Sequence, residues 1–104
     1  MYIVLLIFMK LLNLNKQIIL ITGAAGFLGL QYSKFLCEQG AKVYGIDLNE
    51  NKKIINLKKK YKNFKFQKCD ITDEKDLKNL SNKLFKKKVP TVLINNAALD
   101  FSPD

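Results

Sequence analysis

Residues 18–29 read IILITGAAGFLG, a continuous apolar run that passes directly into a glycine-rich turn. Because the run does not alternate between apolar and polar residues, we expect a strand over 18–21 that is covered on both faces, in the middle of a parallel sheet. The spacing after the turn predicts a helix from about Phe27 to Gln39, which Gly40 would end. Its apolar face is expected to carry Leu28, Tyr32, Phe35 and Leu36.

Downstream of this helix, compact apolar runs alternate with helical spacing, which is the pattern of β-α-β units. Three further strands are expected over 42–46, 64–69 and 91–94, and the second of these alternates like an edge strand. Two further helices are predicted. Asn49 would cap one that runs to about Lys60, and Thr72 would begin one whose last turn holds residues 86–88.

The order of elements is therefore β-α-β-α-β-α-β, and right-handed crossovers place the strands in the order 3-2-1-4. We predict an α/β fold: a Rossmann-like, doubly wound parallel sheet with four strands and three helices. The sheet is expected to be incomplete, because the fourth strand of such a sheet normally lies in its interior and would here have an open edge. That edge would allow a homo-oligomer to form.

Residues 1–15 form an apolar stretch that we interpret as an N-terminal extension of the domain. The stretch is shorter than the roughly 20 apolar residues that span a bilayer, so no membrane span is predicted. It also lacks the leading positive charge and the small residues at a cleavage site that define a signal peptide. Met9 is a more natural start, so residues 1–8 are expected to be an upstream extension, with a short packed helix or strand as the alternative.

The chain has 104 residues and a net charge of +9, and its 18 basic residues are all lysines. Arginine is the residue that contacts bases and phosphates in a bidentate manner, so specific nucleic-acid recognition is not expected. The lysines between residues 52 and 88 are interpreted as a solvated face. With no histidine in the chain, Cys37 and Cys69 lack the partners of a zinc site or a Cys-His nucleophile, and a Ser-His-Asp hydrolase is excluded. A reducing, cytoplasmic location is the simplest interpretation.

The glycines at 23, 26 and 29 stand where the first strand turns into the first helix. Glycine there permits positive φ and close approach of the backbone to a pyrophosphate, while the helix N-terminus offers free N–H groups to the anion. Asp47 ends the second strand 24 residues after Gly23, near the spacing at which a carboxylate accepts hydrogen bonds from an adenosine ribose. This carboxylate would repel a 2′-phosphate, so NAD is predicted over NADP. The alternative is a tight turn and a solvated acid with no ligand.

Three further segments read GAKV at 40–43, CDIT at 69–72 and NNAA at 95–98. With the glycine turn, they make residues 16–99 resemble the N-terminal part of the short-chain dehydrogenase/reductase family. The resemblance implies that residues 16–104 are a partial NAD-binding domain. It implies an adenine contact for Asp70, a backbone contact for Ile71, and a place beside the adenosine ribose for Asn96 and Ala97. The cofactor-binding residues are then expected to be Gly23, Gly26, Phe27, Leu28, Gly29, Asp47, Asp70, Ile71, Asn96 and Ala97.

The family branch stays open. The TGxxGxxG pattern of the turn resembles the extended branch of nucleotide-sugar epimerases and dehydratases, whereas NNAA resembles the shorter branch of reductases. In this family the catalytic tyrosine, lysine and serine lie beyond the fourth strand, so no catalytic residue is assigned and the chain alone is expected to be inactive. The pair Tyr61 and Lys65 has the Tyr-x-x-x-Lys spacing, but it precedes the third strand and is interpreted as chance.

The expected function is therefore that of an NAD-binding N-terminal fragment of an oxidoreductase. In the complete protein, hydride would pass between NAD(H) and a hydroxyl or carbonyl carbon, with a sugar or glycan precursor as a suggested small-molecule substrate. One alternative is a fragment of an extended-branch epimerase or dehydratase. The other is a lysine-rich module that binds a nucleotide or RNA without catalysis.

Overall fold

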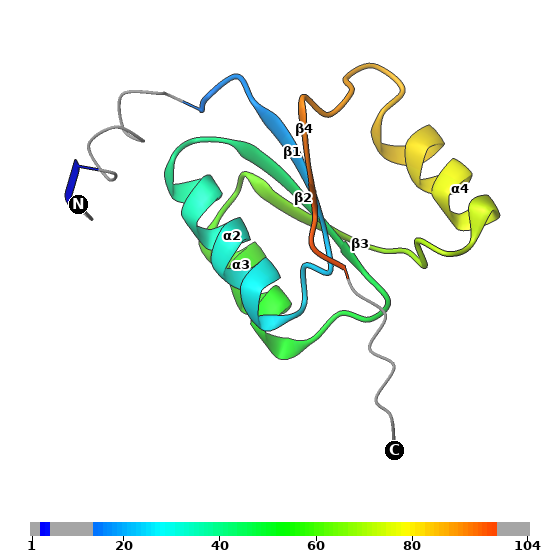
Figure 1. The fold of residues 1–104 in the computed structure, drawn as a ribbon, viewed down its shortest axis with the longest axis horizontal. Coiled ribbons are helices and arrows are strands. Elements are labelled where there is room, and N and C mark those ends of the chain that lie inside the picture. The colour runs from blue at the N-terminus through cyan, green and yellow to red at the C-terminus, as the bar shows by residue number, and fades with distance from the viewer. Residues whose placement is uncertain (1–2, 5–13, 98–104) are drawn as a thin grey trace.

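The computed structural model describes residues 3–4 and 14–97 (Figure 1). Most of the expected N-terminal extension, 1–15, lies outside the described residues. Four strands form one sheet: β1 (Ile18–Thr22), β2 (Lys42–Asp47), β3 (Phe64–Lys68) and β4 (Val92–Asn95). All neighbouring strands are parallel, and their order is β3-β2-β1-β4. The predicted topology and the edge position of the third strand are confirmed.

Three helices cover the sheet on both faces, which confirms the doubly wound arrangement. α2 (Phe27–Glu38) and α3 (Lys52–Lys60) lie side by side on one face, and α4 (Glu74–Leu84) lies on the other (Figure 1). The buried residues follow this division. One core cluster, which includes Ile21, Val43 and Ile54, packs between the sheet and α2 and α3. A smaller one, of Ile46, Cys69 and Leu80, lies under α4.

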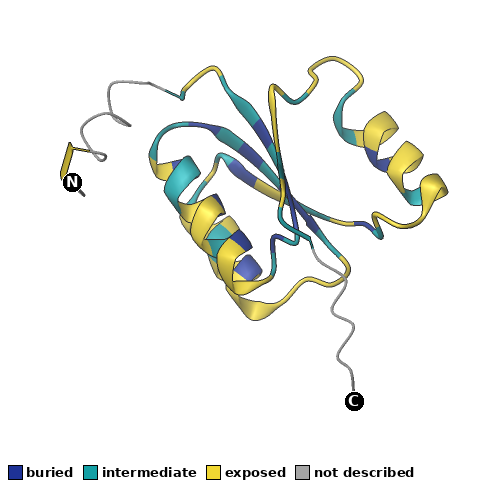
Figure 2. Ribbon diagram, viewed as in Figure 1, coloured by how far each residue is buried: buried dark blue, intermediate teal, exposed yellow. Residues whose placement is uncertain are grey.

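The apolar face of α2 differs in part from the prediction. Leu28 and Tyr32 are 51% and 39% exposed, whereas the small residues Gly29, Ser33 and Cys37 are buried. These three recur every four residues, so they lie on one side of the helix and allow it to pack close to the sheet. Figure 2 shows the outer face of α2 as mostly exposed. The prediction was wrong for Leu28 and Tyr32, because close packing of the helix places its small residues against the sheet, whereas Leu36 packs against the core as expected.

The helix caps also differ from the prediction. Asn51 caps α3 instead of Asn49, and its side-chain Oδ1 accepts a hydrogen bond of 2.9 Å from the Ile54 N–H. Asp73 caps α4 instead of Thr72, because the Thr72 hydroxyl donates to Asp70. α4 ends at Leu84, before the lysines at 86–88 that were expected in its last turn. Asn49 and Asn51, like Thr72 and Asp73, are all residue types that cap helices, so the sequence alone does not decide where each helix begins.

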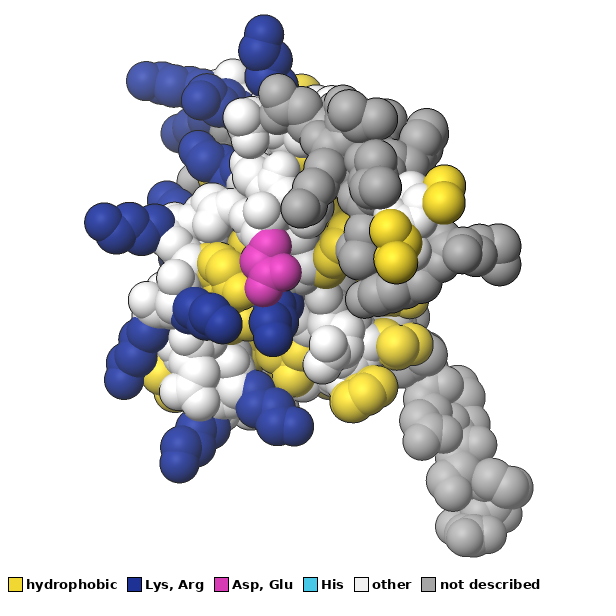
Figure 3. Space-filling view, turned by 90° about the vertical axis from the view of Figure 1, so that its left-hand side faces the viewer, with side chains coloured by type: hydrophobic (Ala, Val, Ile, Leu, Met, Phe, Trp, Pro, Cys, Tyr) yellow, Lys and Arg dark blue, Asp and Glu magenta, His cyan; other side chains and the backbone are white. Residues whose placement is uncertain are grey.

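The lysines of α3 are all exposed, and Figure 3 shows lysine side chains projecting from much of one face of the molecule. Ion pairs within the described part of the chain join Lys58 to Glu50 and Lys78 to Glu74. Most lysine charge on this surface is therefore solvated and not paired in the interior. None of the helices within the described ranges has the length and apolar character needed to cross a membrane.

Candidate functional site

A cavity of about 560 Å³ opens at the carboxyl ends of the parallel strands. This is the edge of an α/β sheet at which ligands bind, and the volume lies in the range of small-molecule sites. Its lining comes from the ends of β1, β2, β3 and β4 and from the loops that follow them. The lining residues are Gly23, Gly26, Ile46, Asp47, Leu48, Cys69, Asp70, Ile71, Thr72, Asn95, Asn96 and Ala97.

Gly23 makes the turn between β1 and α2 possible. Its φ of +67° lies in the left-handed region that side chains disfavour, and a Cβ there would lie 2.9 Å from the Ala97 Cα. The Asn96 side-chain Nδ2 donates to the Gly23 carbonyl at 3.2 Å. The turn after β1 is thus packed directly against the loop after β4.

The start of α2 is open to an anion. Its N-cap is Gly26, which supplies no side-chain cap, and the first helical hydrogen bond runs from Leu30 N–H to Gly26 carbonyl at 3.0 Å. The preceding N–H groups of the first turn therefore have no acceptor inside the helix. A Cβ on Gly26 would meet only the Gly23 carbonyl, at 3.5 Å, so the backbone here is accessible from the cavity. These free donors and the positive end of the helix dipole suit a phosphate group.

Asp47 faces this turn from the end of β2. Its Oδ2 accepts a hydrogen bond of 2.9 Å from the Ala25 N–H, and its Oδ1 accepts one of 2.7 Å from the Leu48 N–H. A carboxylate has about four lone-pair positions, so two hydrogen bonds leave capacity for ligand hydroxyls. Asp47 therefore holds the turn in place and still presents an acceptor to the cavity.

Asp70 and Ile71 line the cavity from the loop after β3. The Asp70 carboxylate accepts hydrogen bonds from the Thr72 hydroxyl at 2.6 Å and from the Thr72 N–H at 2.9 Å. These bonds lower the pKa of Asp70, so the group is ionised at neutral pH. Cys69 lies beside it, and burial raises the pKa of its thiol, which stays neutral.

Thr22 joins the ends of β1 and β4 and was not predicted as a site residue. Its hydroxyl donates to Asn95 Oδ1 at 3.0 Å and accepts from the N–H groups of Asn96 at 3.0 Å and Ala97 at 2.9 Å. The side chain is 6% exposed, so this network is largely shielded from water. A polar residue directly after the apolar run of β1 was the signal that could have identified it.

Seven of the ten predicted site residues line the cavity: Gly23, Gly26, Asp47, Asp70, Ile71, Asn96 and Ala97. Phe27 and Leu28 do not line it, and their side chains are exposed at the start of α2. Gly29 is buried behind the turn, where a Cβ would collide with the Gly23 carbonyl. The cavity is also lined by five residues that were not predicted from the sequence: Ile46, Leu48, Cys69, Thr72 and Asn95.

Tyr61 lies away from this cavity, in a groove between α2 and α3 that Phe27 and Lys60 also line. Its hydroxyl donates to Glu38 Oε1 at 2.6 Å, and this hydrogen bond to a carboxylate raises the pKa of Tyr61 to about 12. Lys65 is exposed on the edge strand β3 and lines neither space. The arrangement agrees with the interpretation of this pair as a chance match.

A glycine turn after β1 that faces a carboxylate after β2, in a sheet of order 3-2-1-4, defines a Rossmann-type nucleotide-binding domain. Residues 17–104 match the family described as short chain dehydrogenase. The chain belongs to this family.

Individual relatives agree with this assignment. The chain is 40% identical over 68 residues to a UDP-glucuronate 4-epimerase of Thermodesulfobacterium geofontis, a match that covers 59% of the chain and 21% of that protein. The structure of a 4-hydroxyisoleucine dehydrogenase complexed with NADH has a TM-score of 0.73 and 29% identity, over 81% of this chain and 35% of that one. The structure of a short-chain dehydrogenase from Leptospira borgpetersenii with bound NAD+ has a TM-score of 0.73 and 26% identity. This match covers 84% of this chain and 33% of that one. The chain thus spans about a fifth of that curated relative and a third of these solved structures.

Proposed function

We propose that this chain binds NAD at the cavity above β1 and β2 and forms the cofactor-binding part of a hydride-transferring oxidoreductase. The observation that carries the proposal is that the uncapped start of α2, at Gly26, and the Asp47 carboxylate line the same cavity. Membership of the short-chain dehydrogenase family, with relatives solved in complex with NADH and NAD+, supports it.

Each part of the ligand has a matching part of the site. The free N–H groups before Leu30 and the open face of Gly26 would hold the pyrophosphate. Asp47 would accept hydrogen bonds from the adenosine ribose, with Asn96 and Ala97 beside it. Asp70 and Ile71 would line the adenine end. When bound, NAD supplies the hydride acceptor, and the residues here bind and orient it.

NAD is proposed over NADP because a 2′-phosphate would meet the negative charge of Asp47. Asp47→Asn removes this charge and keeps one oxygen that accepts from a backbone N–H. Titration calorimetry with NAD+ and NADP+ should show NAD+ preferred by the natural chain. The variant should bind NAD+ more weakly, by about 1 to 3 kcal/mol for loss of a hydrogen bond to a charged group, and should lose the preference.

Asp73→Asn is the matched control, because it removes the same charge at the cap of α4, outside the cavity lining. It should leave both affinities unchanged. Equal affinities for the two cofactors in the natural chain, or the same preference in Asp47→Asn, would remove Asp47 from the ribose site. A natural chain that binds neither cofactor would contradict the proposed function itself.

A second candidate is the cofactor-binding part of a nucleotide-sugar epimerase. It is favoured by the 40% identity to a UDP-glucuronate 4-epimerase and by the TGxxGxxG spacing of the turn. A dehydrogenase must exchange its cofactor after each reaction, whereas an epimerase that returns the hydride to its substrate need not. NAD that stays bound to the complete protein through gel filtration would favour the epimerase, and ready exchange would favour the dehydrogenase. A sugar-type substrate is compatible with both candidates.

Cys37 and Cys69 are both free and buried, and burial raises the pKa of the Cys37 thiol to about 12. Two unpaired thiols suit a reducing compartment, and we place the protein in the cytoplasm on this ground.

A further inference from the structure

The peptide groups on both sides of Ala25 are held by side chains from other elements. The Ala25 N–H donates to Asp47 Oδ2 at the end of β2, and the Ala25 carbonyl accepts a hydrogen bond of 2.9 Å from the side-chain Nδ2 of Asn51. Asn51 precedes α3, 26 residues further along the chain. The glycine turn is therefore tied to the start of a second helix.

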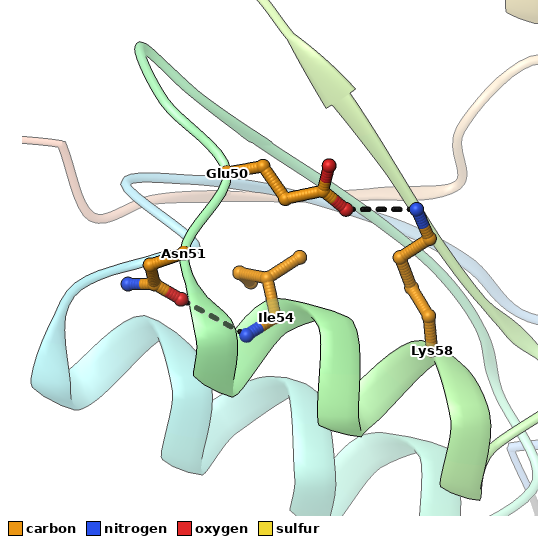
Figure 4. A network of polar contacts seen from close by, with 4 residues as sticks. All are labelled: Glu50, Asn51, Ile54 and Lys58. Atoms are coloured by element: carbon orange, nitrogen blue, oxygen red, sulfur yellow. Dashed lines mark hydrogen bonds and ion pairs between the residues drawn. The ribbon is translucent and has the colours of Figure 1, made fainter.

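Asn51 makes this contact while it caps α3. Figure 4 shows its side-chain oxygen directed at the Ile54 N–H, with the amide nitrogen on the opposite side. The neighbouring Glu50 forms an ion pair of 2.8 Å with Lys58 on the same helix. Serine, threonine and aspartate also cap helices, but an asparagine side chain both accepts a hydrogen bond and donates through a separate NH₂ group. The two contacts together therefore select asparagine at this position.

Ala25 lies between Gly23 and Gly26, which both line the cavity. Holding the peptide groups on either side of Ala25 restricts the rotation of the turn and fixes the direction of the N–H groups that follow it. A ligand then binds without first having to order this backbone, which is an entropic gain in affinity. We propose that Asn51 is a positioning residue for the pyrophosphate of the dinucleotide. The inference rests on the proposed function, and it adds a residue that does not line the cavity.

The test is the Asn51→Ser variant of the full chain. The serine hydroxyl would keep the cap on Ile54, but this single short group cannot also reach Ala25. We expect a folded variant with a slightly lower melting temperature, because it lacks the hydrogen bond to the Ala25 carbonyl. We expect its Kd for NAD+ to be raised by about threefold to tenfold, the equivalent of one hydrogen bond. Asn56→Ser is the matched control on the exposed side of the same helix, and it should bind NAD+ like the natural chain. An Asn51→Ser variant with natural NAD+ affinity would overturn the inference.

A second measurement does not depend on NAD. Amide hydrogen exchange followed by NMR should show faster exchange at Gly26 in Asn51→Ser than in the natural chain, because the Gly26 N–H belongs to the peptide group whose carbonyl Asn51 holds. Asn56→Ser should be unchanged. Equal exchange at Gly26 in all three proteins would overturn the proposal that Asn51 orders the turn, whatever the NAD+ affinities are. If no form of the chain binds NAD+, the proposed function fails and the exchange result still decides whether Asn51 orders the turn.

Discussion

At the scale of single residues, the glycines of the turn meet different physical requirements. Gly23 has a left-handed backbone and lies against Ala97. Gly29 has an ordinary helical position but lies where a Cβ would be 2.7 Å from the Ala24 Cα. Gly26 has an ordinary φ of −79° and free space around it on the protein side. Of these three positions, only Gly26 could hold a side chain without strain or collision in the folded chain. Its lack of a side chain is therefore best explained by the approach of a ligand.

This difference predicts that Gly29→Ala acts mainly on stability and Gly26→Ala mainly on NAD+ binding. Gly29→Ala should destabilise the fold by about 1 to 3 kcal/mol, because the collision is with backbone and outweighs the gain of about 1 kcal/mol in helix propensity. Gly26→Ala should cost less than about 1 kcal/mol of stability, as a poorer N-cap. It should weaken NAD+ about tenfold, because the methyl group occupies the approach of the pyrophosphate. Urea unfolding and NAD+ titration measure the two effects.

The ligand-binding role of Gly26 is contradicted if Gly26→Ala binds NAD+ as the natural chain does. The packing requirement at Gly29 is contradicted if Gly29→Ala is as stable as Gly26→Ala.

At the scale of elements, α2 packs through small residues, and one of them carries an unsatisfied polar atom. Ser33 is fully buried, and its hydroxyl has no hydrogen-bond partner within the described part of the chain. A buried hydroxyl without a partner retains its desolvation cost. The small Ser33 side chain lets α2 pack close to the sheet, but its unpaired hydroxyl lowers the free energy of unfolding.

Ser33→Ala should accordingly stabilise the protein by about 0.5 to 2 kcal/mol, since it removes the unsatisfied hydroxyl and improves helix propensity. Ser81→Ala is the matched control, because Ser81 is an exposed residue of α4 and gains only the propensity. Urea unfolding should give a higher midpoint for Ser33→Ala than for Ser81→Ala. Equal midpoints would show that the Ser33 hydroxyl costs nothing in the folded state.

At the scale of the whole molecule, an open sheet edge and a high positive charge act against each other. β4 pairs with β1 only, no described residue pairs with its outer edge, and Leu93 on it is 61% exposed. Such an edge favours pairing with another chain. The net charge of +9 opposes association through repulsion between lysines.

Self-association should therefore increase with salt, which screens the repulsion. Sedimentation velocity in about 0.05 M and about 0.5 M NaCl should show more dimer or higher oligomer at the higher concentration, where the Debye length is only a few ångströms. Leu93→Lys should reduce this association, whereas Ile55→Lys, which adds the same charge on α3, should reduce it less. A chain that is monomeric at both salt concentrations would contradict the role of the β4 edge.

Strand order and the place of the cavity could be predicted from the sequence. The switch between apolar runs and helical spacing identified the parallel sheet, and chirality left one arrangement of its strands. Because the carboxyl ends of parallel strands meet at one edge, Gly23, Asp47, Asp70 and Asn96 had to lie near one another. This prediction holds although the four residues are far apart in the sequence, because each lies at the carboxyl end of a strand in the same sheet.

The contacts that shape the cavity could not be predicted in this way. The three hydrogen bonds of Thr22 and the tether from Asn51 to Ala25 depend on side-chain directions after the strands and helices have packed. The buried face of α2 depended on how closely the helix approaches the sheet, which placed Gly29 and Ser33 inside and Leu28 outside. Periodicity reports which residues are apolar, whereas hydrogen bonds and close packing are decided by distances of a few ångströms between segments far apart in the chain.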